Sequence, residues 1–164
     1  MYMQEQPAAV LLRLETLLPG LAAYAEGRAR HAHSMRVALW NRVHPDEASP
    51  FKLWSRESAC LDVDYIIEHA TTIGAKIEKR RIEAEPEEGD LGNLLAPLLP
   101  GAVNPNEDVL FVSHEQACSR MPSAGLQQFI EERVVLSGDE ILAGTTTARI
   151  IVLHHEGWLF VLQC

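Results

Sequence analysis

Residues 58–81 read SACLDVDYIIEHATTIGAKIEKRR, and their apolar side chains recur at steps of three and four. This spacing places the apolar side chains on one stripe of an α-helix. An alternating, strand-like pattern also fits the first half of the segment, but it stops at Glu68, whereas the helical period continues for two more turns. We therefore predict one long helix over residues 58–81. The residues expected to face the core are Ile66, Ile67, Ala70 and Ile73.

The length and net charge of the chain limit its number of domains and the partners that it can bind. A chain of 164 residues is long enough to bury one hydrophobic core but too short to form two stable domains. We expect a single domain, with a helical N-terminal brace over residues 1–30 and the core over residues 31–164. The formal net charge of −9 argues against general nucleic-acid binding, which needs a positive surface. We find no signal peptide and no apolar run near the ~20 residues of a membrane span, so we expect a cytoplasmic protein that does not bind membranes.

The segments around this helix have patterns of their own. Residues 7–18 form an amphipathic pattern opened by proline, which predicts a helix. A short helix and then a strand over residues 34–43 are expected next, followed by a Pro-rich turn over residues 44–50. Clustered acidic residues predict a surface loop over residues 83–90, and the leucine-rich but Pro-broken residues 91–101 predict a packed loop.

The second half of the chain is rich in β-branched and aromatic residues. We expect strands over residues 109–112, 126–136, 141–154 and 158–162, the third being the longest and most central. Turns between them make antiparallel pairing the simplest arrangement. The fold class expected from this order is α+β, with one helix packed against one antiparallel sheet.

This order resembles the hotdog fold, in which a curved antiparallel sheet wraps one long apolar helix. Three short motifs make the chain similar to hotdog 3-hydroxyacyl-[acyl-carrier-protein] dehydratases, which often show a Leu-Pro-His opening, a Ser-Pro-Phe triplet before the helix and Ile-Glu-x-x-Ala-Gln within it. The corresponding residues here are Leu18-Pro19-Gly20, Ser49-Pro50-Phe51 and Ile67-Glu68-His69-Ala70-Thr71-Thr72. The resemblance covers most of residues 17–163.

The resemblance implies a hydro-lyase of fatty acid or polyketide biosynthesis that dehydrates 3-hydroxyacyl thioesters. The family uses a His together with a helix carboxylate as acid and base. Glu68 matches the carboxylate, but Gly20 and Trp54 stand where the family has histidines. The chain therefore resembles an inactive or partner-dependent member that handles an acyl carrier protein or coenzyme A thioester.

Two histidines are candidates for the missing catalytic group. His69 is the neighbour of Glu68, and His44 lies in the Pro-rich turn. The competing interpretation is that Glu68 is a solvated helix carboxylate and that both histidines are ordinary surface residues.

The densest basic cluster contains Lys76, Lys79 and Arg80. It is a candidate binding site for the phosphate of a pantetheine arm or for an acidic carrier protein. Four arginines earlier in the chain would extend it: Arg28, Arg30, Arg36 and Arg42. The competing interpretation is a helix C-terminus whose basic residues suit the macrodipole.

Histidine and cysteine patterns do not predict a metal site. On a strand, His31 and His33 would face the same way, whereas His154 and His155 would face opposite ways. No further ligands follow at a recognisable spacing, so we expect neither a metal nor a cofactor. The three cysteines are widely spaced, which indicates buried or free thiols.

Two functions remain open from the sequence. The first is an acyl-thioester-handling hotdog protein. The second is a non-catalytic protein-binding module, such as an acidic inhibitor or a subunit that stabilises a partner, and the missing His and the net charge favour it. A hotdog sheet leaves an edge strand for a second subunit to cover, so we expect a homodimer or heterodimer.

Overall fold

The computed structural model describes residues 3–82, 104–133 and 138–164. Its elements, in chain order, are β1 (Met3–Gln4), α1 (Pro7–Leu17), α2 (Leu21–Val43), α3 (Arg56–Cys60), α4 (Val63–Thr72), β2 (Lys76–Arg81), β3 (Asp108–Val112), β4 (Cys118–Pro122), the 3₁₀ turn η1 (Ser123–Gly125), α7 (Leu126–Arg133), β5 (Glu140–Gly144), β6 (Arg149–His154) and β7 (Trp158–Gln163). The loops expected over residues 83–90 and 91–101 lie outside the described residues.

The strands form one antiparallel sheet in the order β1-β4-β3-β5-β6-β7-β2. Together with the helices, this sheet confirms the α+β class. The strands β3 and β7 and the helix α1 lie where the sequence predicts them. The expected division at residue 30 falls inside α2.

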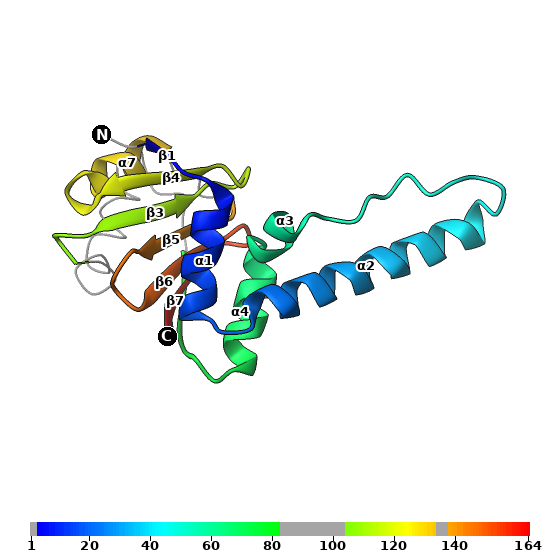
Figure 1. Cartoon of the computed structure of the whole chain (residues 1–164), viewed down its shortest axis with the longest axis horizontal. Helices are drawn as coiled ribbons and strands as arrows, with labels where there is room; N and C mark the ends of the chain where they lie inside the picture. The colour runs from blue at the N-terminus through cyan, green and yellow to red at the C-terminus, as the bar shows by residue number, and fades with distance from the viewer. Residues whose placement is uncertain (1–2, 83–103, 134–137) are drawn as a thin grey trace.

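Both faces of the sheet are covered, which explains why its central strands are apolar on consecutive residues. On one face, Leu14 of α1 and Ile66 of α4 pack with strand residues such as Ile150. On the other face, Ile130 of α7 packs with residues such as Ile151. Figure 1 shows α1 lying along the sheet and α2 projecting away from it.

The prediction of one long helix over residues 58–81 is wrong. The segment contains α3, then a second start at Asp62, whose side chain accepts a hydrogen bond from the backbone N–H of Tyr65. This N-cap begins α4, and Gly74, at a φ of +77°, follows its end. The remaining residues form β2, in which Ile77 pairs with Leu162 of β7. A long central helix, as in the hotdog fold, is not evident among the described residues.

The end of α4 also corrects the expected core. Ile66 and Ala70 are fully buried and Ile67 is partly buried against the same cluster, as predicted. Ile73 follows the last residue of α4 and is 44% exposed. The helical stripe stops before this residue, so the prediction that Ile73 faces the core is wrong.

Two strand predictions are also corrected to helices. Residues 34–43 continue α2, because their apolar positions also fit the helical period and no neighbouring strand pairs with them in the described part of the chain. Residues 126–133 form α7, where Leu126, Phe129 and Ile130 share one buried face at helical spacing. Their side chains cover the sheet instead of extending it.

The strand expected over residues 141–154 is instead the hairpin of β5 and β6. Its turn is organised by the buried carboxylate of Glu107, which accepts hydrogen bonds from the hydroxyls of Thr146 and Thr147 and from the backbone N–H of Thr147. A Cβ atom at Gly144 would lie 1.6 Å from Glu107 Oε1, so a glycine is needed where the carboxylate crosses the hairpin. Burial alone would raise the pKa of Glu107, but these hydrogen bonds outweigh it and lower the pKa.

We predict that Ile66→Ala lowers the free energy of unfolding by about 2 to 5 kcal/mol, because it leaves a cavity in a fully buried position. Ile73→Ala is the matched control, and its cost should be within about 0.5 kcal/mol because the side chain is exposed. Urea unfolding of both variants measures the difference. Equal costs would contradict the assignment of α4 to the core.

We predict that Glu107→Gln destabilises the protein at neutral pH, since the amide replaces a carboxylate that accepts several hydrogen bonds. The folded-state pKa of Glu107 is lowered, so its contribution is present above its unfolded pKa of about 4.3 and is lost as the pH falls below that value. Urea unfolding at a series of pH values should therefore show a smaller loss of stability in acid for the variant. An identical pH dependence for both proteins would refute this role.

Candidate functional site

The larger candidate site is a cleft between α4 and the β6–β7 turn, which we call the α4–β7 cleft. Its lining residues are Asp64, Ile67, Glu68, Lys79, His154, His155, Glu156, Trp158 and Phe160. Its volume of about 260 Å³ is below the roughly 300 to 1,000 Å³ of typical small-molecule pockets. The cleft therefore suits an ion or one side chain better than a large ligand.

His154 is buried at the end of β6, and both of its ring nitrogens are used. Nδ1 accepts a hydrogen bond from the backbone N–H of Glu156 at 3.2 Å. Nε2 therefore carries the ring proton and donates it to Asp64 Oδ1 at 2.7 Å. The two bonds fix the ring and connect the β6–β7 turn to α4.

His155 stacks on His154, with the ring centroids 4.2 Å apart and the planes 28° from parallel. Its Nδ1 lies 2.9 Å from Asp139 Oδ1, which also accepts its backbone N–H at 2.8 Å. The hydrogen bond to Asp139 raises the pKa of His155. On a strand the two histidines would face opposite ways, but β6 ends at His154 and His155 belongs to the turn, so the two rings lie side by side.

Lys79 lies against the aromatic wall of the cleft. Its Nζ is 3.9 Å from the ring centroid of Trp158 and 5.6 Å from that of Phe160. Arg81 approaches the same Trp158 ring, with its Cζ 4.9 Å from the centroid. These are cation–π contacts, which hold the cations beside the cleft.

The basic cluster Lys76, Lys79 and Arg80 belongs to β2 and not to the end of a helix, so the macrodipole interpretation is wrong. β2 is an outermost strand of the described sheet. Of the three residues, only Lys79 lines the α4–β7 cleft, while Arg80 pairs with Glu78 of its own strand. Basic side chains on an edge strand also discourage pairing with other sheets.

Glu68 is brought to the same cleft as Lys79, as a shared substrate site would require. However, its Oε2 accepts hydrogen bonds from the Tyr24 hydroxyl at 2.9 Å and from Arg28 Nε at 3.2 Å. Burial and the hydrogen bond to Glu68 raise the pKa of Tyr24. Glu68 therefore ties α4 to α2, a structural role that already accounts for its position.

The two candidate histidines do not complete a catalytic pair with Glu68. His69 is buried, places Nε2 2.7 Å from the carbonyl oxygen of Pro19, and is not a lining residue of the cleft. The prediction that it is a surface histidine is wrong. His44 is the C-cap residue of α2. It follows Arg28, the partner of Glu68 on that helix, by sixteen residues, so the two are about 24 Å apart along the helix axis.

Two acidic residues were not identified from the sequence: Asp64, which lines the cleft, and Asp139, which binds the lining residue His155. Asp64 precedes Glu68 by four residues, so the two lie on the same helix face, and this spacing could have identified Asp64 as a neighbour of the candidate site. Asp139 gave no local signal, because only the pairing of β5 with β6 brings it beside His155. His31 and His33, which would share a face on a strand, lie on α2, where side chains two residues apart do not face each other.

A second candidate region is the part of α2 beyond Arg28 together with the segment that returns to α3; we call residues 28–56 the α2 arm. It projects away from the sheet (Figure 1). Six of the fourteen Lys and Arg residues lie in it, against two of the twenty-three Asp and Glu residues. Its exposed large apolar side chains are Met35, Leu39, Val43, Phe51, Leu53 and Trp54.

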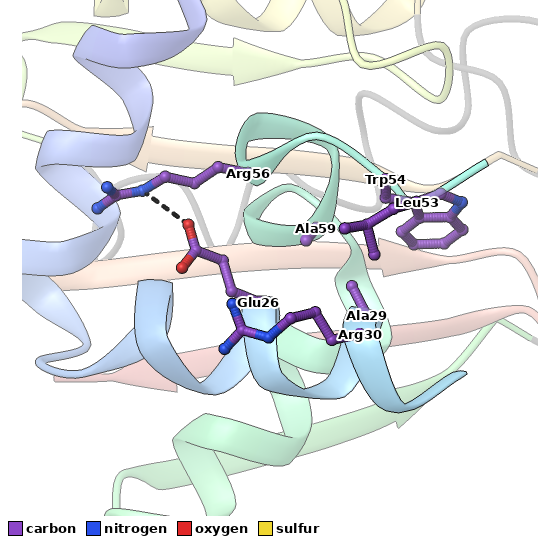
Figure 2. Close-up of a pocket in the computed structure, with 7 residues that line it drawn as sticks. All are labelled: Glu26, Ala29, Arg30, Leu53, Trp54, Arg56 and Ala59. Carbon is purple, nitrogen blue, oxygen red and sulfur yellow. Dashed lines mark ion pairs between the residues drawn. The ribbon is translucent and has the colours of Figure 1, made fainter. Parts of the chain in front are cut away.

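The base of the α2 arm contains a shallow pocket between α2, the return segment and α3. Figure 2 shows its lining residues, which are Glu26, Ala29, Arg30, Leu53, Trp54, Arg56 and Ala59. Arg56 Nε lies 3.3 Å from Glu26 Oε1 and pairs α3 with α2. Farther along, the Arg36 guanidinium lies 5.9 Å from the Trp54 ring, and the Trp40 ring packs edge-on against Phe51. These contacts hold the return segment against the helix.

Comparisons of the chain with protein-family models, with curated proteins and with solved structures found no match. Within the described residues, no single helix has the length and apolar character to cross a membrane. Only the bent pair α1 and α2, which meet at 110°, satisfies both criteria when taken together.

Proposed function

We propose that this chain is a protein-binding module whose α2 arm binds an acidic protein partner. The observation that carries this proposal is the combination of exposed apolar side chains and net positive charge on one projecting segment. Exposed apolar surface is a common mark of protein interaction sites. The arm therefore has the properties of a ligand for a groove.

The apolar side chains on the helix have the spacing that groove binding uses. Met35, Leu39 and Val43 follow one another at steps of four, so they form a single stripe, and all three are exposed. A helix that inserts such a stripe into an apolar groove is a recurring mode of recognition. Phe51, Leu53 and Trp54 on the return segment would widen the contact.

The charge of the arm indicates the chemistry of the partner. Its excess of arginine and lysine favours an acidic surface and disfavours arm-to-arm pairing of two copies, because like charges would face each other. An acyl carrier protein, the partner implied by the dehydratase resemblance, is one acidic protein of this kind. A heterodimer with such a partner is the assembly that follows.

The arm is also organised before binding. Its base is tied to the body by Arg28 with Glu68 and by Arg56 with Glu26, and the Arg36–Trp54 contact holds the return segment. These surface ion pairs contribute little stability individually. However, an element that is ordered before it binds loses less conformational entropy on association.

We predict that a photo-crosslinking amino acid at position 39 forms adducts with an acidic protein in cells, whereas one at position 12 does not. Leu12 is the matched control because it is also an exposed leucine on a helix, but outside the arm. The captured protein is then purified, and its affinity for the full chain is measured. Leu39→Glu should weaken binding at least about tenfold, as expected for loss of a central apolar contact, and Leu12→Glu should not.

Several outcomes would contradict the proposal. Adducts that form equally at both positions would indicate no specific use of the arm. Adducts with a second copy of the chain alone would make the arm a self-association element. A captured protein that is not acidic, or whose affinity does not change in Leu39→Glu, would also refute it.

A second candidate function is acyl-thioester binding, which the presence of Glu68 and Lys79 in one cleft favours. In this function Lys79 would hold the phosphate of a pantetheine arm and Glu68 would polarise the thioester. It is the weaker candidate, because Glu68 already binds Tyr24 and Arg28. The two histidines that line the same cleft, His154 and His155, are likewise engaged, with Asp64 and Asp139.

For this second function, we predict binding of acyl coenzyme A without efficient dehydration of 3-hydroxyacyl substrates. One positioned acid or base contributes typically about 10² to 10⁴ in rate, so the loss of the family histidine should leave turnover slow or absent. Mass spectrometry of the substrates measures turnover, and titration calorimetry of Lys79→Ala measures the role of the lysine. Rapid turnover that Glu68→Gln abolishes would overturn the prediction.

A further inference from the structure

Two histidines that line the α4–β7 cleft and an aspartate beside them bring typical metal ligands together. The ligand atoms of Asp139, His154 and His155 all lie within 4.8 Å of one another. Ligand atoms on one tetrahedral zinc ion, each about 2.0 to 2.2 Å from the metal, stand roughly 3.3 to 3.6 Å apart. The ligand atoms are therefore at most about 1.5 Å farther apart than they would be on one zinc ion.

The backbone, and not the side chains alone, brings these residues together. The hairpin register pairs Glu140 of β5 with Leu153 of β6, so the residues just outside this pair, Asp139 and His154, are neighbours. The backbone N–H of His155 binds Asp139 Oδ1, which fixes the turn against the start of β5. A site held by paired strands is rigid enough to select a metal geometry.

Two further carboxylates surround the cluster. Asp64 binds His154 Nε2 at 2.7 Å, and Glu156 also lines the cleft. A carboxylate beside a metal-binding histidine orients the ring and increases its basicity, or supplies a fourth ligand itself. The negative charge of these groups would be balanced by a divalent cation.

We propose that Asp139, His154 and His155 bind a divalent metal ion of the zinc class, with Asp64 as a fourth ligand or orienting partner. Two imidazoles and carboxylate oxygens suit zinc, nickel or copper, whereas calcium and magnesium prefer oxygen ligands alone. In the metal-free protein the same atoms form the hydrogen bonds described above. Binding replaces the Asp139–His155 bond with two metal–ligand bonds, and ligation by His154 Nδ1 replaces the hydrogen bond from the Glu156 N–H. The proton on His155 Nδ1 moves to Nε2 of the same ring, or to solvent where both ring nitrogens are protonated.

The bound ion would join three separate elements. Asp139 precedes β5, His154 ends β6 and is followed by His155 in the turn, and Asp64 comes from α4. The metal would thus cross-link the β5–β6 hairpin to α4 beside the cleft. This site is separate from the α2 arm, so a failed test of metal binding would leave the proposed protein binding unaffected, and the reverse also holds.

The test is titration calorimetry of the metal-stripped full chain with zinc chloride, and separately with magnesium chloride. We expect one zinc ion per chain and no comparable magnesium binding. Asp139→Asn and His155→Gln should each weaken zinc binding at least about tenfold, since each removes a ligand. His44→Gln and His33→Gln are the matched controls, because these histidines lie on the α2 arm, and their zinc affinity should stay unchanged.

A second measurement separates lost binding from lost folding. Zinc should raise the thermal unfolding midpoint of the original chain and of the control variants, but not that of Asp139→Asn, whose far-ultraviolet circular dichroism should remain that of the folded protein. Absence of stoichiometric zinc binding would overturn the proposal. Binding that survives both ligand substitutions, that is lost in His33→Gln, or that magnesium reproduces would overturn it as well.

Discussion

The rest of the structure depends on the need to cover both faces of one antiparallel sheet. Its central strands carry apolar side chains on consecutive positions, so neighbours such as Ile150 and Ile151 point to opposite faces and both are buried. A sheet with one face exposed to solvent would carry alternating apolar and polar residues, whereas these central strands are apolar on both faces. The chain must therefore supply helices on both sides: α1 and α4 on one face and α7 on the other.

This requirement explains why only the first part of α2 packs in the core. α2 begins with buried residues, including Leu21, Ala25 and Ala29, that pack near the sheet and α3. Ala29 is the last buried residue of α2, and the rest of the helix projects away from a sheet face that α1 and α4 already cover (Figure 1). The apolar residues farther along, such as Leu39, remain exposed in the described part of the chain. An exposed apolar stripe on an ordered helix is costly unless a partner covers it, and this is the physical basis of the proposed binding function.

The strands β3 and β7 could be predicted from the sequence, because residues 109–112 and 158–162 are short, apolar runs bounded by turns. The segment 58–81 was misread because periodicity reports which positions are apolar but not where a helix stops. Asp62 and Gly74 interrupt it through a cap and a positive φ, local devices that the apolar period does not record. The strand expected over residues 34–43 failed for a different reason: its alternation coincides with a helical period, and only the absence of pairing among the described strands decides between them.

The candidate site was harder to predict because its members are brought together by tertiary structure. Glu68 and Lys79 do share a cleft, although one was expected in the middle and the other at the end of a single helix. Had residues 58–81 formed that helix, eleven residues would have separated the two by about 16 Å along its axis. Instead the chain reverses after α4, and β2 pairs with β7 and carries Lys79 onto the ring of Trp158. The break at Gly74 that defeats the helix prediction is therefore the same feature that creates the cleft.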